Sequence, residues 1–218
     1  MRSASPPGGT SGHARDAVAA AMRVVDRRAF VPRAQRRWAG QDRPLAIGHG
    51  QTNSQPSTVA AMLRLLDVAP GDGVLDVGSG SGWTTALLAV LVGPAGHVLG
   101  VERDPDLAAW GAANLATAHS PWARIVTAPR GVLGTPGERY DRILVSAAAD
   151  TLPEALVGQL APGGRMVIPI RHTMVLVEAA PSVPGEPDEP GRVRLSEHGS
   201  YSFVPLVEDP PGPTGSPG

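Results

Sequence analysis

Cysteine and lysine are both absent from the 218 residues of this chain. Without cysteine the chain can form no disulfide bond, cysteine nucleophile or thiolate metal site, which suits a reducing cytoplasm. All 19 basic residues are arginine, so lysine chemistry such as a Schiff base or a P-loop lysine is also excluded. We therefore expect a cytoplasmic location.

Long apolar runs are missing as well. No run approaches the roughly 18 residues that a membrane span needs, and the first nine residues lack the apolar centre of a signal peptide. The formal net charge of −1 provides no global attraction to nucleic acid or to an anionic membrane. The six histidines are scattered without ligand spacing. We expect no membrane partner, no nucleic-acid partner and no metal site.

Arginines cluster in one early stretch: Arg23, Arg27, Arg28, Arg33, Arg36 and Arg37. A solvated helix face is the favoured interpretation of this cluster. A nucleic-acid surface is the alternative, but few aromatic residues accompany the arginines for base stacking.

Proline, serine and glycine dominate both ends of the chain. Residues 1–13 and 210–218 show no apolar period and are predicted to be disordered tails. The length and the hydrophobic fraction fit a single domain over residues 14–209. Residues 181–191 form another proline- and glycine-rich stretch, interpreted as a loose hairpin connection between two strands.

Between the tails, helix-like segments alternate with short apolar runs. The alternation predicts an α/β fold, namely a doubly wound, mostly parallel sheet with helices on both faces and antiparallel C-terminal strands. The expected helices span residues 17–25, 57–66, 83–92, 106–118 and 153–160, the last closed by a Pro-Gly-Gly turn at 162–164. The expected strands span residues 73–77, 97–101, 124–127, 142–145, 165–170, 174–178 and 201–207. Ligands bind such sheets beyond the carboxyl ends of the strands.

A glycine-rich loop follows the first expected strand of this sheet. The loop holds Gly78, Gly80 and Gly82, and Glu102 stands at the end of the next strand, 20 residues after Gly82. Glycines at such a junction permit positive φ and a close approach of a ligand to the backbone. A carboxylate in this position can accept hydrogen bonds from both hydroxyls of a ribose. A tight turn with a surface glutamate is the alternative interpretation.

The ligand could be a dinucleotide or S-adenosylmethionine. Dinucleotide loops prefer the G-x-G-x-x-G spacing, whereas the third glycine here follows the second by two residues. Asp76 would repel a pyrophosphate but suits the cationic end of an amino acid. Both features favour S-adenosylmethionine over a nicotinamide cofactor. The run from Val74 through Asp76, Gly78, Ser79 and Gly80 to Gly82 resembles motif I of the class I methyltransferases, which have a Rossmann-like fold.

A polar, glycine-rich segment, residues 42–56, precedes a predicted helix. Ser54 could cap that helix, and the free N–H groups of a helix start attract carboxylates. From the residues alone, this segment indicates an anion site near the cofactor.

Several stretches together resemble the protein-L-isoaspartate O-methyltransferases. They are the Gly50-Gln-Thr-Asn-Ser-Gln-Pro56 string, a lead-in over residues 21–32, the 140–148 stretch after the glycine loop, residues 152–164, and Phe203-Val-Pro-Leu206. The similarity covers roughly residues 17–208 in family order. It implies methyl transfer from S-adenosylmethionine to the carboxylate of an isoaspartyl residue in a damaged protein or peptide, by a monomer.

The resemblance also implies roles for individual residues. Ser54 matches the active-site serine of the family, and with Thr52 it is expected to hold the substrate carboxylate. Because a carboxylate is already ionised at neutral pH, the reaction needs hydrogen-bond donors and alignment rather than a general base. Asp76, Gly78, Ser79, Gly80, Gly82 and Glu102 are expected to bind the cofactor. Ser146 is expected to border the cavity.

The chain departs from the family pattern at several positions. Arg130 stands where an aspartate usually meets the adenine amino group, Asn53 where isoleucine is common, and Ser57 where an aromatic residue is common. Arginine cannot accept the adenine hydrogen bond, so either a backbone carbonyl replaces the aspartate or cofactor binding is weakened. These departures leave two alternatives open: a methyltransferase that acts on an aspartyl residue of one dedicated peptide, and a non-catalytic ligand-binding member.

Overall fold

The computed structural model describes the backbone of residues 10–182 and 191–207, and the side chains of these stretches from residue 17 onward. Its central sheet has the strand order β5-β4-β3-β6-β7-β8-β9. The strands of this sheet are β3 (Gly73–Val77), β4 (His97–Glu102), β5 (Ala123–Thr127), β6 (Tyr140–Val145), β7 (Leu160–Ile170), β8 (Thr173–Ala179) and β9 (Val193–Ser200). Strands β3 to β7 pair in parallel, and β8 and β9 are added antiparallel. The predicted fold class is confirmed.

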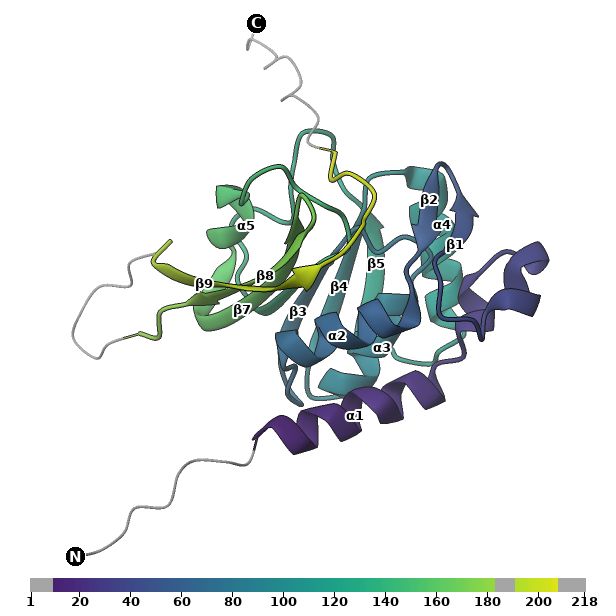
Figure 1. Cartoon of the computed structure of the whole chain (residues 1–218), viewed down its shortest axis with the longest axis horizontal. Helices are drawn as coiled ribbons and strands as arrows, with labels where there is room; N and C mark the ends of the chain where they lie inside the picture. The colour runs from purple at the N-terminus through teal and green to yellow at the C-terminus, as the bar shows by residue number, and fades with distance from the viewer. Residues whose placement is uncertain (1–9, 183–190, 208–218) are drawn as a thin grey trace, which may run out of the picture.

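The helices are α1 (Thr10–Val24), α2 (Pro56–Leu66), α3 (Trp83–Val92), α4 (Pro105–Ala116) and α5 (Glu154–Val157), with the 3₁₀ helices η1 (Arg27–Phe30) and η2 (Arg33–Trp38). A separate hairpin of β1 (Leu45–Gly48) and β2 (Gln51–Asn53) lies beside the main sheet (Figure 1). The sequence had indicated only an irregular polar segment there. None of the helices in the described stretches is long and apolar enough to cross a membrane.

Two hydrophobic layers flank the sheet. Helices α1 to α4 pack on one face, where Leu63 and Leu87 meet Val74 of β3. On the other face, Leu75 packs in the layer that contains Leu156 of α5. Adjacent residues of a strand point to opposite faces, so the continuous apolar run of β3 is buried on both sides. This complete burial explains why the predicted bounds of the strand match the observed ones.

The strand order reverses around β3. The chain passes from β3 to β4 on one side, while β6 joins β3 on the other side. Such a switch point leaves a crevice at the carboxyl ends of the strands, because the connections diverge there. The loops after β3, β4 and β6 all open at this point.

Three predicted boundaries are wrong. Helix α1 begins at Thr10, seven residues before the expected start, so it takes in part of the predicted tail. Helix α5 is only four residues long, and β7 begins at Leu160, which pairs with Tyr140. The Pro-Gly-Gly turn expected at 162–164 therefore lies inside a strand, at an irregularity of its register. The predicted tail residues 1–9 and 210–218 lie outside the described stretches.

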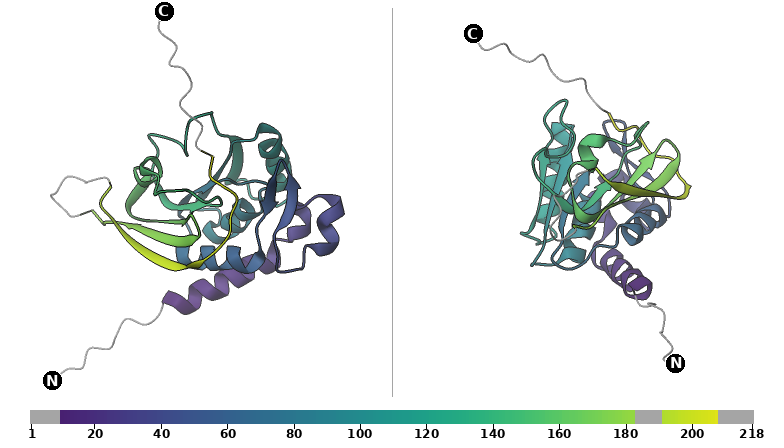
Figure 2. Two further views of the ribbon diagram at one scale, coloured as in Figure 1. Left: turned by 45° about the horizontal axis from the view of Figure 1, so that its top comes forward. Right: turned by 90° about the vertical axis from the view of Figure 1, so that its left-hand side faces the viewer.

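The predicted C-terminal strand is also wrong. Strand β9 occupies the free edge of β8, and residues 201–207 instead cross the ends of the strands (Figures 1 and 2). We call residues 201–207 the C-terminal strap. Ala148, just after β6, donates its N–H to the carbonyl of Val204 at 2.8 Å and accepts from the N–H of Leu206 at 2.7 Å. The predicted 181–191 connection joins β8 to β9, but residues 183–190 fall outside the described stretches.

Candidate active site

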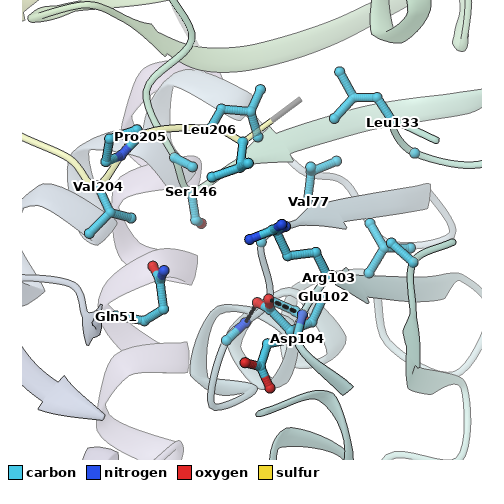
Figure 3. A pocket seen from close by; sticks show the side chains of 18 of the residues that line it. Gln51, Val77, Glu102, Arg103, Asp104, Leu133, Ser146, Val204, Pro205 and Leu206 are labelled. Atoms are coloured by element: carbon cyan, nitrogen blue, oxygen red, sulfur yellow. Dashed lines mark hydrogen bonds between the residues drawn. The ribbon is translucent and has the colours of Figure 1, made fainter. Parts of the chain in front are cut away.

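A cavity of about 430 Å³ opens at the switch point of the sheet. This volume falls within the usual range for small-molecule sites, roughly 300–1,000 Å³. Six of the eight predicted site residues line it: Thr52, Ser54, Gly78, Ser79, Gly80 and Glu102. Ser146 also lines it, and Figure 3 shows Ser146 and Gln51 reaching the cavity from different segments. Gln51 was not predicted as a site residue. The remaining two, Asp76 and Gly82, are not part of the cavity wall.

Glu102 is held at the end of β4 by backbone donors. One carboxylate oxygen accepts the N–H of Gly80 at 3.0 Å, and the other accepts the N–H of Asp104 at 3.1 Å (Figure 3). The side chain is only 7% exposed. Each carboxylate oxygen has a second lone pair, so the fixed group can still accept two hydroxyl protons from the cavity side.

Gly82 acts in packing behind the loop. It begins α3 with a φ of 89°, and a Cβ atom there would lie 2.8 Å from the carbonyl oxygen of Gly111 in α4. A side chain at this position would therefore combine backbone strain with a collision. The glycine allows the loop and α4 to pack closely, which places Gly78 and Gly80 at the cavity.

Asp76 lies fully buried behind the same loop. One oxygen accepts hydrogen bonds from the hydroxyls of Thr84 and Thr85, both at 2.7 Å. The other has no partner among the described residues. Burial raises the pKa of Asp76 to about 6, although the two hydroxyl donors act in the opposite direction. Contact of Asp76 with the methionine part of a ligand stays a prediction. In the structure Asp76 lies behind the cavity wall and holds Thr84 and Thr85 at the start of α3.

Ser54 follows the β1–β2 hairpin, and its expected role as a helix cap is wrong. Helix α2 has Gln55 at its N-cap position without a side-chain cap, and Asp42 accepts the N–H of Ser57 at 2.8 Å instead. The hydrogen bond from the N–H of Ser57 is the main reason that the pKa of Asp42 lies below its usual value, and the side-chain amide of Gln55 adds to the effect. The Ser54 hydroxyl makes no hydrogen bond to any described residue. It is therefore available to a ligand in the cavity.

Arg27 was assigned to a solvated face, and this assignment is wrong. Its side chain is 5% exposed, stacks over the ring of Trp83 at 5.1 Å and donates six hydrogen bonds. Two of these reach the backbone carbonyls of Asn53 and Ser54, at 3.1 and 2.8 Å. Burial lowers the pKa of Arg27 to about 10, so the guanidinium is still charged at neutral pH. A cation thus lies directly behind the predicted substrate site.

The loop after β5 forms another part of the wall. Pro129 and residues 131–134 line the cavity, whereas Arg130 is exposed and is not part of the wall. The buried amide of Gln159 holds this loop, because it donates to the carbonyl of Leu133 and accepts the N–H of Thr135, at 2.9 and 2.8 Å. The arginine that replaces the expected aspartate therefore leaves the cavity free. Gln159 was not predicted as a site residue.

The hairpin also reaches the far side of the cavity. His49, at its turn, lies 2.8 Å from a carboxylate oxygen of Asp104, which follows Glu102 in the chain by two residues. The pKa of Asp104 lies below its usual value, mainly because the carboxylate accepts the N–H of Leu107 and to a smaller extent because His49 lies beside it. Possible ligand atoms of His49, Asp104 and Asp106 come within 4.8 Å of one another, but all three residues are at least partly exposed. We interpret the close contact of His49 with Asp104 as a polar link that connects the hairpin to the cofactor side.

The cavity geometry agrees with a family comparison. The sequence model of the family described as Protein-L-isoaspartate(D-aspartate) O-methyltransferase (PCMT) matches residues 10–210. The chain belongs to this family. The protein-L-isoaspartate O-methyltransferase of Aeropyrum pernix is 47% identical over 192 residues, covering 86% of this chain and 71% of that protein. The protein-L-isoaspartate O-methyltransferase of Methanopyrus kandleri is 46% identical over 194 residues, covering 87% and 83%.

A solved structure supports the same conclusion about this protein-L-isoaspartate O-methyltransferase family member. A beta-aspartate methyltransferase (PCMT) from Plasmodium falciparum in complex with S-adenosyl-L-homocysteine has a TM-score of 0.73 at 28% identity. The alignment covers 89% of this chain and 91% of that chain. The resemblance stated from the sequence is confirmed.

Proposed function

We propose that this chain transfers a methyl group from S-adenosylmethionine to the carboxylate of L-isoaspartyl residues in damaged proteins or peptides. One observation carries the proposal. A single cavity joins the glycine loop and Glu102 to the free hydroxyl of Ser54, with the charged Arg27 behind it. The family match and the curated relatives support the same reaction.

The cavity wall fits S-adenosylmethionine. Ser79 Oγ and Trp83 Nε1 are buried without a partner among the described residues, and both residues line the cavity. Unpaired buried polar atoms are costly, so a ligand that pairs them is favoured. Glu102 would accept the ribose hydroxyls, and Gly78 and Gly80 would let the ligand approach the backbone. When bound, S-adenosylmethionine supplies an electrophilic methyl group on a sulfonium.

Ser54 and Thr52 would hold the substrate carboxylate. Within the described residues the buried Arg27 donates only to carbonyl and amide oxygens, and Asp42 attracts its charge without a hydrogen bond to it. The guanidinium therefore contributes a positive field that favours an anion at Ser54. The reacting carboxylate oxygen needs no base, and the residues act by orienting it and excluding water. Methyl transfer would break the bond between the methyl carbon and the sulfonium sulfur as the bond to the carboxylate oxygen forms, so one positive and one negative charge would be lost together.

The wider assignments belong to the same proposal. The predicted domain over residues 14–209 stays a proposal, and its start moves to Thr10 because helix α1 begins there; the family match over residues 10–210 supports a single domain. We propose that the enzyme acts as a cytoplasmic monomer on protein and peptide substrates, without nucleic-acid, membrane or metal partners. The absence of cysteine from the sequence supports the cytoplasmic location.

A matched peptide pair tests the proposed reaction. Purified protein is incubated with labelled S-adenosylmethionine and a peptide that contains either isoaspartate or aspartate at one position, and base-labile methyl esters are counted. We expect labelling of the isoaspartyl peptide alone, and about a hundredfold lower rate for Ser54→Ala than for the control Ser57→Ala. Labelling of neither peptide, with binding of S-adenosylmethionine intact by calorimetry, would indicate a dedicated aspartyl peptide as substrate. Absence of binding would indicate a non-catalytic member.

A further inference from the structure

The buried side chain of Asn53 bridges the two halves of the cavity. We propose that Asn53 is a positioning residue that ties the Thr52–Ser54 segment to the glycine loop through Ser81. A cofactor that orders the loop would then also fix the position of Ser54. This inference rests on the proposed function for its catalytic consequence, but the bridge itself is a property of the fold.

The bridge uses both ends of one amide. Asn53 is 5% exposed, its Oδ1 accepts from Arg27 Nε at 2.6 Å, and its Nδ2 donates to Ser81 Oγ at 3.1 Å. Arginine can only donate, so it must face the amide oxygen, and the amide nitrogen is left to face the serine. The orientation of the amide is therefore determined by chemistry, and neither end can turn without losing a buried hydrogen bond.

The Arg27 end is rigid. Besides the Asn53 amide, the guanidinium donates to the carbonyls of Ala39, Gln41 and Arg43, at 3.2, 3.1 and 2.9 Å, and to those of residues 53 and 54. One planar group thus holds the segment before the hairpin and the segment after it in a fixed relation. Movement of Asn53 would disturb several of these bonds together, which makes the hairpin a unit rather than a loose loop.

The Ser81 end is equally fixed. Ser81 is 3% exposed, lies between Gly80 and Gly82, and accepts a hydrogen bond on its carbonyl from Asn114 of α4 at 3.0 Å. The neighbouring Gly80 N–H is held by Glu102. Any ligand that binds Glu102 and the glycine loop therefore acts on the same short stretch of backbone that carries the Ser81 hydroxyl.

The bridge matters because methyl transfer requires a defined separation between acceptor oxygen and methyl donor. A misplacement of about 1 Å can cost on the order of a hundredfold in rate. The donor is held by the glycine loop and the acceptor by the hairpin, and Asn53 joins the two with a dry, directional link. Since coupling between two sites is reciprocal, bound substrate would also tighten the cofactor side.

Hydrogen exchange tests the link without any methyl acceptor. Exchange of the amides of residues 45–55 is measured with and without saturating S-adenosyl-L-homocysteine, whose binding to each variant is first established by calorimetry. The variants are Ser81→Ala and Asn53→Leu. Arg28→Ala serves as control because its side chain is exposed and, among the residues that the structure describes, pairs only with Asp26. We expect about tenfold slower exchange on binding in the wild type and in the control, and less than about twofold in both bridge variants.

Kinetics give the catalytic arm. We expect Ser81→Ala and Asn53→Leu each to lower kcat about tenfold, with KM for S-adenosylmethionine within about threefold. The double variant should be no worse than Asn53→Leu alone, because Asn53→Leu already removes the link to Ser81. Equal protection of residues 45–55 in wild type and variants, even with a lowered unfolding temperature, would show a merely structural role and overturn the inference. A wild type that methylates no peptide would refute the proposed function while the exchange result still decides the link.

Discussion

Asp76 provides a quantitative test of the buried architecture behind the glycine loop. Its pKa of about 6, against an ordinary value of 3.8, arises mainly from burial, which disfavours the ionised form. Replacing it with asparagine keeps the shape and leaves an oxygen for the hydroxyls of Thr84 and Thr85, but removes the charge. A pKa raised by about two corresponds to about 3 kcal/mol, the cost of ionising the group inside the folded protein.

The sign of the effect follows from this direction. Because the folded protein binds the Asp76 proton more tightly than the unfolded chain, the contribution to stability is complete below about pH 4. It is lost as the pH rises through about 6. The stability of Asp76→Asn relative to the wild type should therefore rise by about 1–1.5 kcal/mol between pH 5 and pH 8. The offset common to all pH values depends on the amide nitrogen, which takes the place of the unpaired Oδ1.

Urea unfolding of both proteins at pH 5, 7 and 8 measures the difference directly. The exposed Asp106→Asn substitution removes one carboxylate elsewhere in the described structure and is the matched control. A stability difference between Asp76→Asn and the wild type that stays constant over this range would refute the reasoning from burial. Such a result would mean that Asp76 does not titrate as its surroundings require.

Three further substitutions test separate parts of the site. Arg27→Met should lower the free energy of unfolding by about 3–5 kcal/mol, because six hydrogen-bond acceptors lose their donor. Urea titration measures this change, and the control Arg28→Met should leave the midpoint of urea unfolding unchanged. His49→Ala should speed release of S-adenosyl-L-homocysteine a few-fold in stopped flow, because it removes the contact with Asp104 that connects the hairpin to the cofactor side. An equal gain in Asp106→Ala, which leaves that contact in place, would contradict this cause. Gln159→Leu should raise KM for S-adenosylmethionine about tenfold with little change in kcat, since it releases the loop of residues 131–135, and initial rates that show the reverse pattern would place its effect elsewhere.

The cofactor half of the site was predictable because its signals are local. Strand β3 and helix α3 have the predicted bounds, and the glycine loop between them is readable as a run of residue types. Glu102 follows from the strand pattern, since the end of β4 must lie beside the end of β3 in a parallel pair. Four of the six residues predicted to bind the cofactor line one cavity for this reason, namely Gly78, Ser79, Gly80 and Glu102.

The substrate half depends on contacts that no local pattern reveals. Arg27 belongs to a run of arginines whose other members are exposed, and only folding distinguishes it by placing Trp83 and the carbonyls of residues 39–54 around it. The Asp26-to-Phe30 stretch gave no periodicity that would mark one buried arginine. Arginine side chains are rarely buried, so the sequence favours a solvated position for each member of the run.

The prediction of the last strand of the sheet was wrong because two strand-like segments compete for one edge. Residues 201–207 have the composition of a strand, but β9 takes the edge that they would need, and Pro205 cannot donate to a ladder. The strap therefore bonds to Ala148 and lines the cavity. Which of two strand-like segments pairs with an edge is decided by the whole fold rather than by either segment.

The hydrogen bonds of Arg27 have a consequence for how this fold can change. They all end within residues 39–54, so the hairpin side of the site is built from a contiguous stretch of chain, whereas the cofactor side is assembled from loops far apart in the sequence. A short genetic exchange over residues 27–54 could thus bring in a different acceptor pocket as a unit. Such an exchange would need to keep one compatible polar partner for Ser81. Relatives with a different acceptor specificity would then differ from this chain chiefly within residues 27–54.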